Sequence, residues 1–170
     1  MILIETNLEG ESMKKFLNIG YWTVLFIYLY LLIDTVFFAR DVRRSINLIP
    51  FDMIAEQGFT LNVWGNILMF IPLGLYFADL MKKFRFWKVL GYIIGTSLGI
   101  EVMQYIFKRG ASDIDDLLLN TAGGLIGIFI YLVFKAIFKV KARVHVAISI
   151  LSLVVGIPII LLTIILFVYN

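Results

Sequence analysis

The order of apolar and polar positions divides the chain into long hydrophobic stretches separated by short polar segments. Five stretches lack the regular polar face of a soluble helix, and each approaches the about 20 residues that a helix needs to cross a bilayer core. None shows the dyad alternation of a transmembrane β-barrel. The pattern therefore predicts an all-α, polytopic integral membrane protein, with about five transmembrane helices in a compact bundle. The predicted spans are Phe16–Ala39, Val63–Met81, Phe86–Phe107, Leu117–Phe138 and Val144–Tyr169.

The spacing of these stretches predicts the domain organisation. Residues 1–15 are expected to form a short, acidic cytoplasmic tail, residues 16–138 a four-helix membrane core, and residues 139–170 an additional C-terminal transmembrane helix. Composition agrees, because 61% of the 170 residues are hydrophobic and only 16% are charged. A mean hydropathy of +0.96 lies far outside the range of soluble globular domains. No room is left for a separate soluble domain.

The distribution of Lys and Arg between the two ends of the helices predicts the orientation. Ten basic residues fall on the side of the N-terminus and five on the other side, and the richer side is expected to be cytoplasmic. We therefore expect a cytoplasmic N-terminus, an external C-terminus, and external segments 40–62 and 108–116. The first set is Lys14, Lys15, Lys82, Lys83, Arg85, Lys88, Lys135, Lys139, Lys141 and Arg143; the second is Arg40, Arg43, Arg44, Lys108 and Arg109.

Polar residues within the predicted spans lie near the same, outer, end of each helix. Such groups are costly in hydrocarbon, so they are expected to meet one another or to line a wet cavity. The spacing i, i+3 places Glu101 and Gln104 on one helix face, and a short connection brings that face towards Asp116 and Asn120. We predict a shared outer-facing polar pocket with these candidate ligand-binding residues: Asn47, Asn66, Glu101, Gln104, Arg109, Asp113, Asp115, Asp116 and Asn120. Asp34, near the outer end of the first span, is expected in the same region.

Two interpretations stay open for the charged members of this set. Asp113, Asp115 and Asp116 suit the start of a helix, where they cap free N–H groups and meet the helix dipole, or they suit a functional cavity. Glu101 fits either a structural ion pair with Lys108 or Arg109, or a functional role. Arg109 could instead bind an anion.

Two further patterns concern packing near this pocket. Residues 47–51 form an apolar stretch that is too short to span the membrane, and we expect it to rest on the outer interface or to fold into the mouth of the pocket. Gly91, Gly95 and Gly99 recur every four residues on the third span, and Gly123 and Gly127 repeat this spacing on the fourth. The small-xxx-small spacing predicts close packing of these two helices, and it is equally compatible with a role of the glycines in general packing only.

Several kinds of chemistry are excluded or unsupported. The chain has no Cys and a single His145, which removes disulfides, thiolate zinc sites and histidine pairs. It lacks a Gly-rich phosphate loop and a Gly-x-Ser-x-Gly nucleophile motif. Its basic residues cluster at helix ends, so nucleic-acid binding is not expected. No cofactor, metal site or catalytic residue is assigned.

Five short motifs, in this order and spacing, resemble those of the VanZ-like family over about residues 45 to 130. They are Asn47-Leu48-Ile49-Pro50-Phe51; Asn66 to Gly74 with Pro72; Glu101-x-x-Gln104; Arg109-x-x-x-Asp113-x-Asp115-Asp116; and Asn120-Thr121-x-Gly123-Gly124. The resemblance implies a small multi-pass protein of the bacterial plasma membrane and cell envelope. It also implies an association with resistance to glycopeptide antibiotics of the teicoplanin type.

Three functional hypotheses remain open. The first is a non-enzymatic envelope protein whose outer pocket binds a membrane lipid or another amphiphile, such as a lipid-linked cell-wall precursor or a glycopeptide drug. The second is a metal-dependent membrane enzyme that acts on a phosphate-bearing lipid through Asp113, Asp115 and Asp116. The third is a proton-coupled carrier that uses Glu101 and Asp116, although no inverted repeat is visible.

Overall fold

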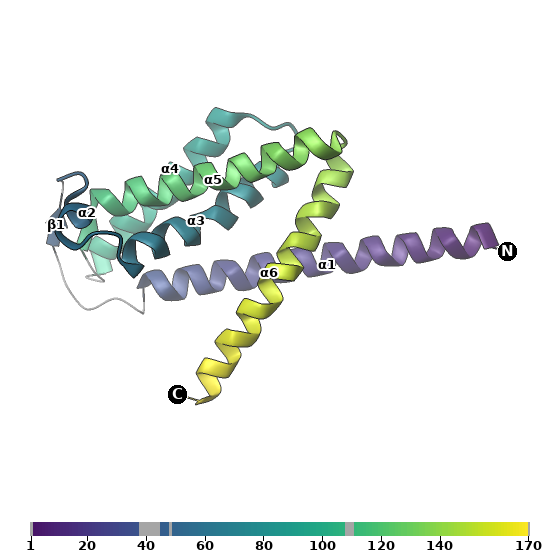
Figure 1. The fold of residues 1–170 in the computed structure, drawn as a ribbon, viewed down its shortest axis with the longest axis horizontal. Helices are drawn as coiled ribbons and strands as arrows, with labels where there is room; N and C mark the ends of the chain where they lie inside the picture. Colours follow the sequence, from purple (N-terminus) through teal and green to yellow (C-terminus); the bar gives the residue numbers. More distant parts are fainter. Residues whose placement is uncertain (1, 38–44, 48, 108–110, 170) are drawn as a thin grey trace. The chain divides into compact units, whose positions relative to one another are not determined.

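The computed structural model describes residues 2–37, 45–47, 49–107 and 111–169. Within these ranges the chain forms six helices and two short strands (Figure 1). In chain order they are α1 (Ile2–Phe37), β1 (Ser45–Asn47), α2 (Asp52–Gln57), α3 (Leu61–Leu80), α4 (Phe86–Phe107), β2 (Ala111–Asp113), α5 (Ile114–Phe138) and α6 (Lys141–Tyr169).

The predicted all-helical membrane architecture is confirmed. Five helices of the described chain are long and apolar enough to cross a membrane, and they correspond one to one with the spans predicted from the sequence. The short tail predicted for residues 1–15 is helical from Ile2 onward and continues directly into the first span. The spans are Gly10–Val36, Leu61–Leu80, Phe86–Phe107, Ile114–Phe138 and Lys141–Leu166.

The chain divides into two compact units. Unit 1 contains residues 1–31 and 134–170, and unit 2 contains residues 32–133. In unit 1, α1 and α6 cross where glycines let side chains of the other helix approach, with Gly20 against Leu153 and Gly156 against Val24. The ring of Tyr21 packs on His145 with centroids 4.6 Å apart, so the single histidine has a packing role.

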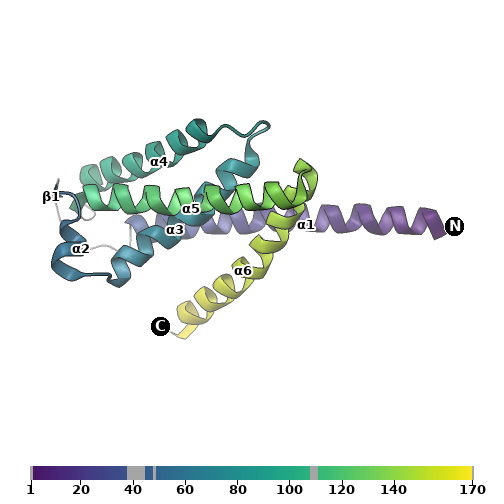
Figure 2. The same cartoon turned by 45° about the horizontal axis from the view of Figure 1, so that its top comes forward.

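The core of unit 2 is a close crossing of α3 and α5, which run side by side in Figures 1 and 2. A Cβ added to Gly123 would overlap the carbonyl of Ile67, and one added to Gly127 would overlap that of Ile71. A Cβ on Gly74 would likewise overlap the carbonyl of Gly124. The two backbones therefore touch directly, as small residues allow in membrane helices.

The prediction that the glycines of the third span pack against those of the fourth span is wrong. The fourth span, α5, uses Gly123 and Gly127 against α3 rather than against α4. Gly91, Gly95 and Gly99 lie on an exposed face of α4, where an added Cβ would meet nothing within 4 Å. The same spacing serves packing on one helix and leaves an open face on the other, because only the neighbours decide which face is covered.

The segment that follows α1 is fixed by pairing with the connection between α4 and α5. β1 and β2 run parallel, with Ser45 opposite Ala111 and Asn47 opposite Asp113. The short helix α2 follows, after a turn at Pro50 and Phe51. Within residues 47–51, Asn47 and the N–H of Phe51 contact the start of α5, and Leu48 lies outside the described residues. Whether this segment rests on the outer interface or enters the mouth of a pocket stays a prediction. We call the end of unit 2 formed by β1, β2 and α2 the strand end.

The glycine crossing leads to a test of stability. We expect Gly127→Ala to lower the free energy of unfolding by about 1–3 kcal/mol, because the new methyl group must push α3 away from α5. Gly95→Ala, on the open face of α4, is the matched control and should change stability by less than about 0.5 kcal/mol. Denaturation of the purified protein in detergent micelles measures both. Equal effects of the two substitutions would contradict the proposed role of Gly127.

Candidate functional site

The start of α5 carries three carboxylates, Asp113, Asp115 and Asp116, which we call the acidic turn. Acids are favoured there because the first N–H groups of a helix are unpaired and its dipole is positive. Asp113 Oδ1 accepts the N–H of Asp115 at 2.9 Å, which is the capping interaction that the sequence allowed. Asp115 and Asp116 are both fully buried.

The two buried acids reach past their own helix to other segments. Asp115 Oδ1 accepts the backbone N–H of Phe51, in the turn before α2. Asp116 Oδ1 accepts the side-chain amide of Asn66, one turn into α3. Capping alone therefore does not account for the acidic turn, since its last two members tie α5 to the Phe51 turn and to α3.

Asn47 links β1 to the same cluster. Its Nδ2 group donates to Asp52 at 3.1 Å and to Asp113 at 3.4 Å, while its Oδ1 accepts the N–H of Ile49 at 3.1 Å. The half-buried side chain thus joins the strand, the turn after it, α2 and the acidic turn.

A polar face of α4 meets the acidic turn from the other side. Glu101 Oε2 accepts the N–H of Asp113 at 3.0 Å, and Ser97 Oγ accepts Nδ2 of Asn120 at 2.9 Å. One turn further along, Ile93 packs on Gly124. The contacts of residue 93 with residue 124, and of residue 97 with residue 120, show that α4 and α5 run antiparallel. Four residues further along α4, residue 101 therefore lies level with residue 116 of α5. The expected approach of Glu101 to the acidic turn is therefore found, whereas Asn120 lies level with Ser97, one turn away from Glu101.

Two buried carbonyl oxygens in this region have no hydrogen-bond partner among the described residues. Gln104 donates through Nε2 to the Val36 carbonyl at 3.0 Å, but its Oε1 is unpaired. Asn120 donates to Ser97, and its Oδ1 is likewise unpaired. An unpaired buried acceptor costs free energy, so these two oxygens destabilise the buried polar region locally.

The surroundings of Asp113, the residue directly before the fourth span, shift the pKa of its carboxyl. Burial raises the pKa of its carboxyl above the ordinary value of 3.8. The Asp115 N–H lowers the pKa, the charges of Asp116 and Asp115 raise it, and the bond from Asn47 lowers it. Because the folded pKa lies above the unfolded one, this group stabilises the fold fully below pH 3.8 and loses that contribution as the pH rises through the folded pKa.

The structure brings together most of the residues selected from the sequence. One network of hydrogen bonds includes Asn47, Glu101, Asp113 and Asp115. Asn66 pairs with Asp116 and Asn120 pairs with Ser97 next to this network, and Gln104 lies one turn from Glu101 on α4. Arg109 and Lys108 lie outside the described residues. The predicted ion pair of Glu101 with either of them, and the predicted anion site at Arg109, therefore stay predictions.

One residue that was expected in the polar region lies outside it, and three groups that form hydrogen bonds there were not predicted from the sequence. The side chain of Asp34 is exposed, and α1 contributes the carbonyl of Val36 instead. Ser97 could have been found, because it lies four residues before Glu101 on the same helix face. The Phe51 N–H and the Val36 carbonyl carry no sequence signal, because every non-proline residue has these groups.

The site does not show the geometry that the metal-dependent alternative requires. Among the described residues, no three or more His, Asp or Glu side chains are arranged so that they could hold a metal ion. The acids are instead separated by the backbone and amide donors that each of them binds.

The Asn66–Asp116 pair provides a test of the network. Asn66→Leu should lower the free energy of unfolding by about 1.5–3 kcal/mol, because it removes the donor to a buried carboxylate. The exchange Asn66→Asp with Asp116→Asn reverses donor and acceptor, and we expect it to recover stability relative to Asn66→Asp alone. Thermal unfolding followed by circular dichroism measures each variant. Failure of the exchange to recover any stability would show that the pair is not coupled.

The comparisons with known proteins agree with the motif pattern. The VanZ/LLP1 family matches residues 16–135. A relative, the protein VanZ of Enterococcus faecium, is 34% identical over 110 residues, which are 65% of this chain and 65% of that protein. This chain therefore matches less than two thirds of the length of its relative. No solved structure matches the chain. The family match includes α3, α4, the acidic turn and nearly all of α5, and the chain belongs to the VanZ/LLP1 family.

Proposed function

We propose that the protein contributes to resistance against glycopeptide antibiotics of the teicoplanin type by binding an amphiphilic ligand at the strand end. Family membership and the relation to VanZ support the association with resistance. The ligand is a lipid-linked cell-wall precursor or the drug itself. In this proposal the strand end faces outward from a bacterial plasma membrane, with the N-terminus cytoplasmic, in agreement with the bias of basic residues.

The observation that carries the proposal is the conformation of Phe51. Its backbone is left-handed, with φ 65° and ψ 13°, which is an unfavourable region for a bulky side chain. The buried carboxylate of Asp115 holds its N–H, and its ring remains 61% exposed. A strained residue persists only where its surroundings enforce it, and such strain is concentrated at functional sites. Here the strain keeps an aromatic ring at the surface beside a polar network.

The surroundings of Phe51 suit a ligand with both an apolar and a polar part. Ile49, Phe51 and Phe59 expose apolar side chains at the strand end. The acidic network lies next to them, and its carboxylates would accept hydrogen bonds from amide, amine or hydroxyl groups of the ligand. Arg109, which follows α4, would meet an anionic group such as a phosphate or a carboxylate.

A binding role is favoured over catalysis by the way the acids are used. Each member of the acidic turn accepts a hydrogen bond from a neighbouring donor, so at least one oxygen of each serves the fold. The non-enzymatic hypothesis needs only a positioned surface with free acceptors. The proposed partner is thus a membrane-embedded or membrane-associated amphiphile.

The conformation of Phe51 predicts an unusual combination of effects. Phe51→Gly should raise the free energy of unfolding by about 1 kcal/mol, because glycine relieves the left-handed strain, while it abolishes teicoplanin tolerance by removing the ring. Tolerance is measured as the minimum inhibitory concentration in a susceptible host that expresses each variant at an equal membrane level. Stability is measured on the purified protein.

Two matched variants separate strain from contact. Phe51→Ala keeps the strained backbone and removes the ring, so it should lose tolerance without gaining stability. Phe59→Gly removes a similarly exposed aromatic ring from the same end and should not be stabilising, because the backbone of Phe59 is not left-handed. Full tolerance in cells that express Phe51→Gly would disprove the proposal.

The charged groups provide a second test. Glu101→Gln retains an acceptor for the Asp113 N–H, so the double variant Glu101→Gln, Arg109→Ala should remain folded. We expect its tolerance to fall to that of cells without the protein, because two ligand-binding charges are lost. Arg143→Ala, an exposed position in unit 1, is the control for loss of a positive charge. Unchanged tolerance in the double variant would exclude a ligand site at the strand end.

A further inference from the structure

A second candidate site lies at the other end of α3 from the strand end. A cavity of about 610 Å³ is lined by residues of α3, α4 and the connection between them. The lining residues are Phe77, Leu80, Met81, Gly91, Tyr92, Gly95 and Thr96. This volume is in the range of small-molecule sites, and the lining is mainly apolar.

The groove is open because α4 presents glycines along it. A Cβ added to Gly91 or to Gly95 would meet nothing within 4 Å, and both residues are exposed. The rings of Phe77 and Tyr92 pack against each other across α3 and α4, with centroids 5.7 Å apart. An exposed apolar groove between membrane-spanning helices faces the acyl chains of the bilayer.

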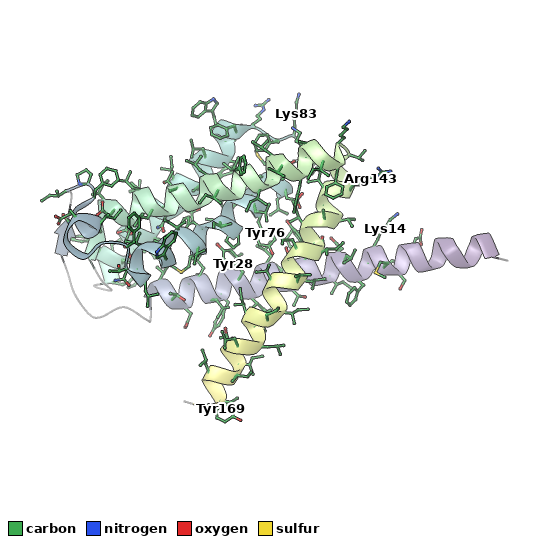
Figure 3. All side chains as sticks on the ribbon, viewed as in Figure 1. Lys14, Tyr28, Tyr76, Lys83, Arg143 and Tyr169 are labelled. Carbon is green, nitrogen blue, oxygen red and sulfur yellow. The ribbon has the colours of Figure 1, made fainter. Side chains whose placement is uncertain are left out.

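Exposed basic residues adjoin the lining of this groove in the sequence. Met81 of the lining is followed directly by Lys82 and Lys83, and all four basic residues of this region, Lys82, Lys83, Arg85 and Lys88, are exposed. Figure 3 shows Lys83 extending away from the ribbon beside the α3–α4 connection. Lys88, Gly91, Tyr92 and Gly95 follow the spacing i, i+3, i+4 and i+7, so the charge of Lys88 lies on the face of α4 that lines the groove.

From this combination we infer that the groove binds an anionic phospholipid. One acyl chain occupies the groove, and the phosphate lies among the basic residues at its mouth. Basic residues next to a membrane attract anionic headgroups, and apolar burial holds the chain. The site is independent of the strand end and of the proposed role in drug tolerance.

The charges also argue against a second copy of the chain in the groove. Two copies in one membrane share the same orientation, so helices that docked in parallel through this face would place their basic residues side by side. The repulsion between like charges opposes that arrangement, whereas an anionic headgroup neutralises it.

Native mass spectrometry of the full chain in mild detergent tests the inference with phosphatidylglycerol and phosphatidylcholine as probes. Wild-type protein should retain phosphatidylglycerol in preference to phosphatidylcholine. Gly95→Leu should weaken phosphatidylglycerol retention about tenfold or more, because its side chain fills the groove without clashing with the protein. Lys82→Gln with Lys88→Gln should reduce the preference for phosphatidylglycerol by about fivefold per lysine.

Matched variants make the result decisive. Gly65→Leu, in α3 and outside the groove lining, also has space for a side chain and should leave lipid retention unchanged. Circular dichroism checks that each variant is folded. Equal retention by Gly95→Leu and wild type, or no preference for phosphatidylglycerol, would overturn the inference. The alternative is that a second copy of the chain occupies this face. That alternative would be supported if the wild-type protein formed a dimer, if Gly99→Leu dissociated the dimer, and if Gly95→Leu retained lipid as the wild type does.

Discussion

Unit 2 depends on hydrogen bonds between buried carboxylates and their donors around the start of α5. Asp116 holds Asn66 of α3, Asp115 holds the turn at Phe51, and the N–H of Asp113 is held by Glu101 of α4. In an environment with little water, a buried acid without such partners would be strongly destabilising. These bonds therefore fix α3, α4 and the Phe51 turn relative to one another at the strand end.

Glycine packing complements these bonds further along the helices. The acidic turn determines where α5 begins, and Gly123 and Gly127 then bring its backbone against α3. Gly124 receives Ile93 of α4 on another side of the same helix. The glycines of α4 are not used in this way, and a Cβ added to Gly91, Gly95 or Gly99 would meet nothing within 4 Å. The open groove beside Tyr92 is thus a consequence of how the core is packed.

The two candidate sites of unit 2 differ in physical character. At the strand end, buried hydrogen-bonding groups support an exposed and strained aromatic residue, which suits recognition of a ligand with polar and apolar parts. At the other end of α3, an apolar groove adjoins exposed positive charges, which suits a phospholipid. The proposed role of the first site in glycopeptide resistance rests on membership of the VanZ/LLP1 family, and the second site follows only from the arrangement of this chain's own residues.

The sequence alone determined the properties that depend on local composition and periodicity. Five apolar stretches predicted the five spans, because the thickness of a bilayer sets the length of an apolar helix. Spacing on one helix face and the short α4–α5 connection predicted that Glu101 approaches the acidic turn.

Only the tertiary structure decided which partners these groups have. Identical small-xxx-small patterns gave a packed face on α5 and an open face on α4, and the main-chain groups of Phe51 and Val36 entered the network without any distinguishing residue type. The physical reason is that a sequence pattern specifies which face of a helix a residue occupies, whereas the three-dimensional packing specifies what that face meets.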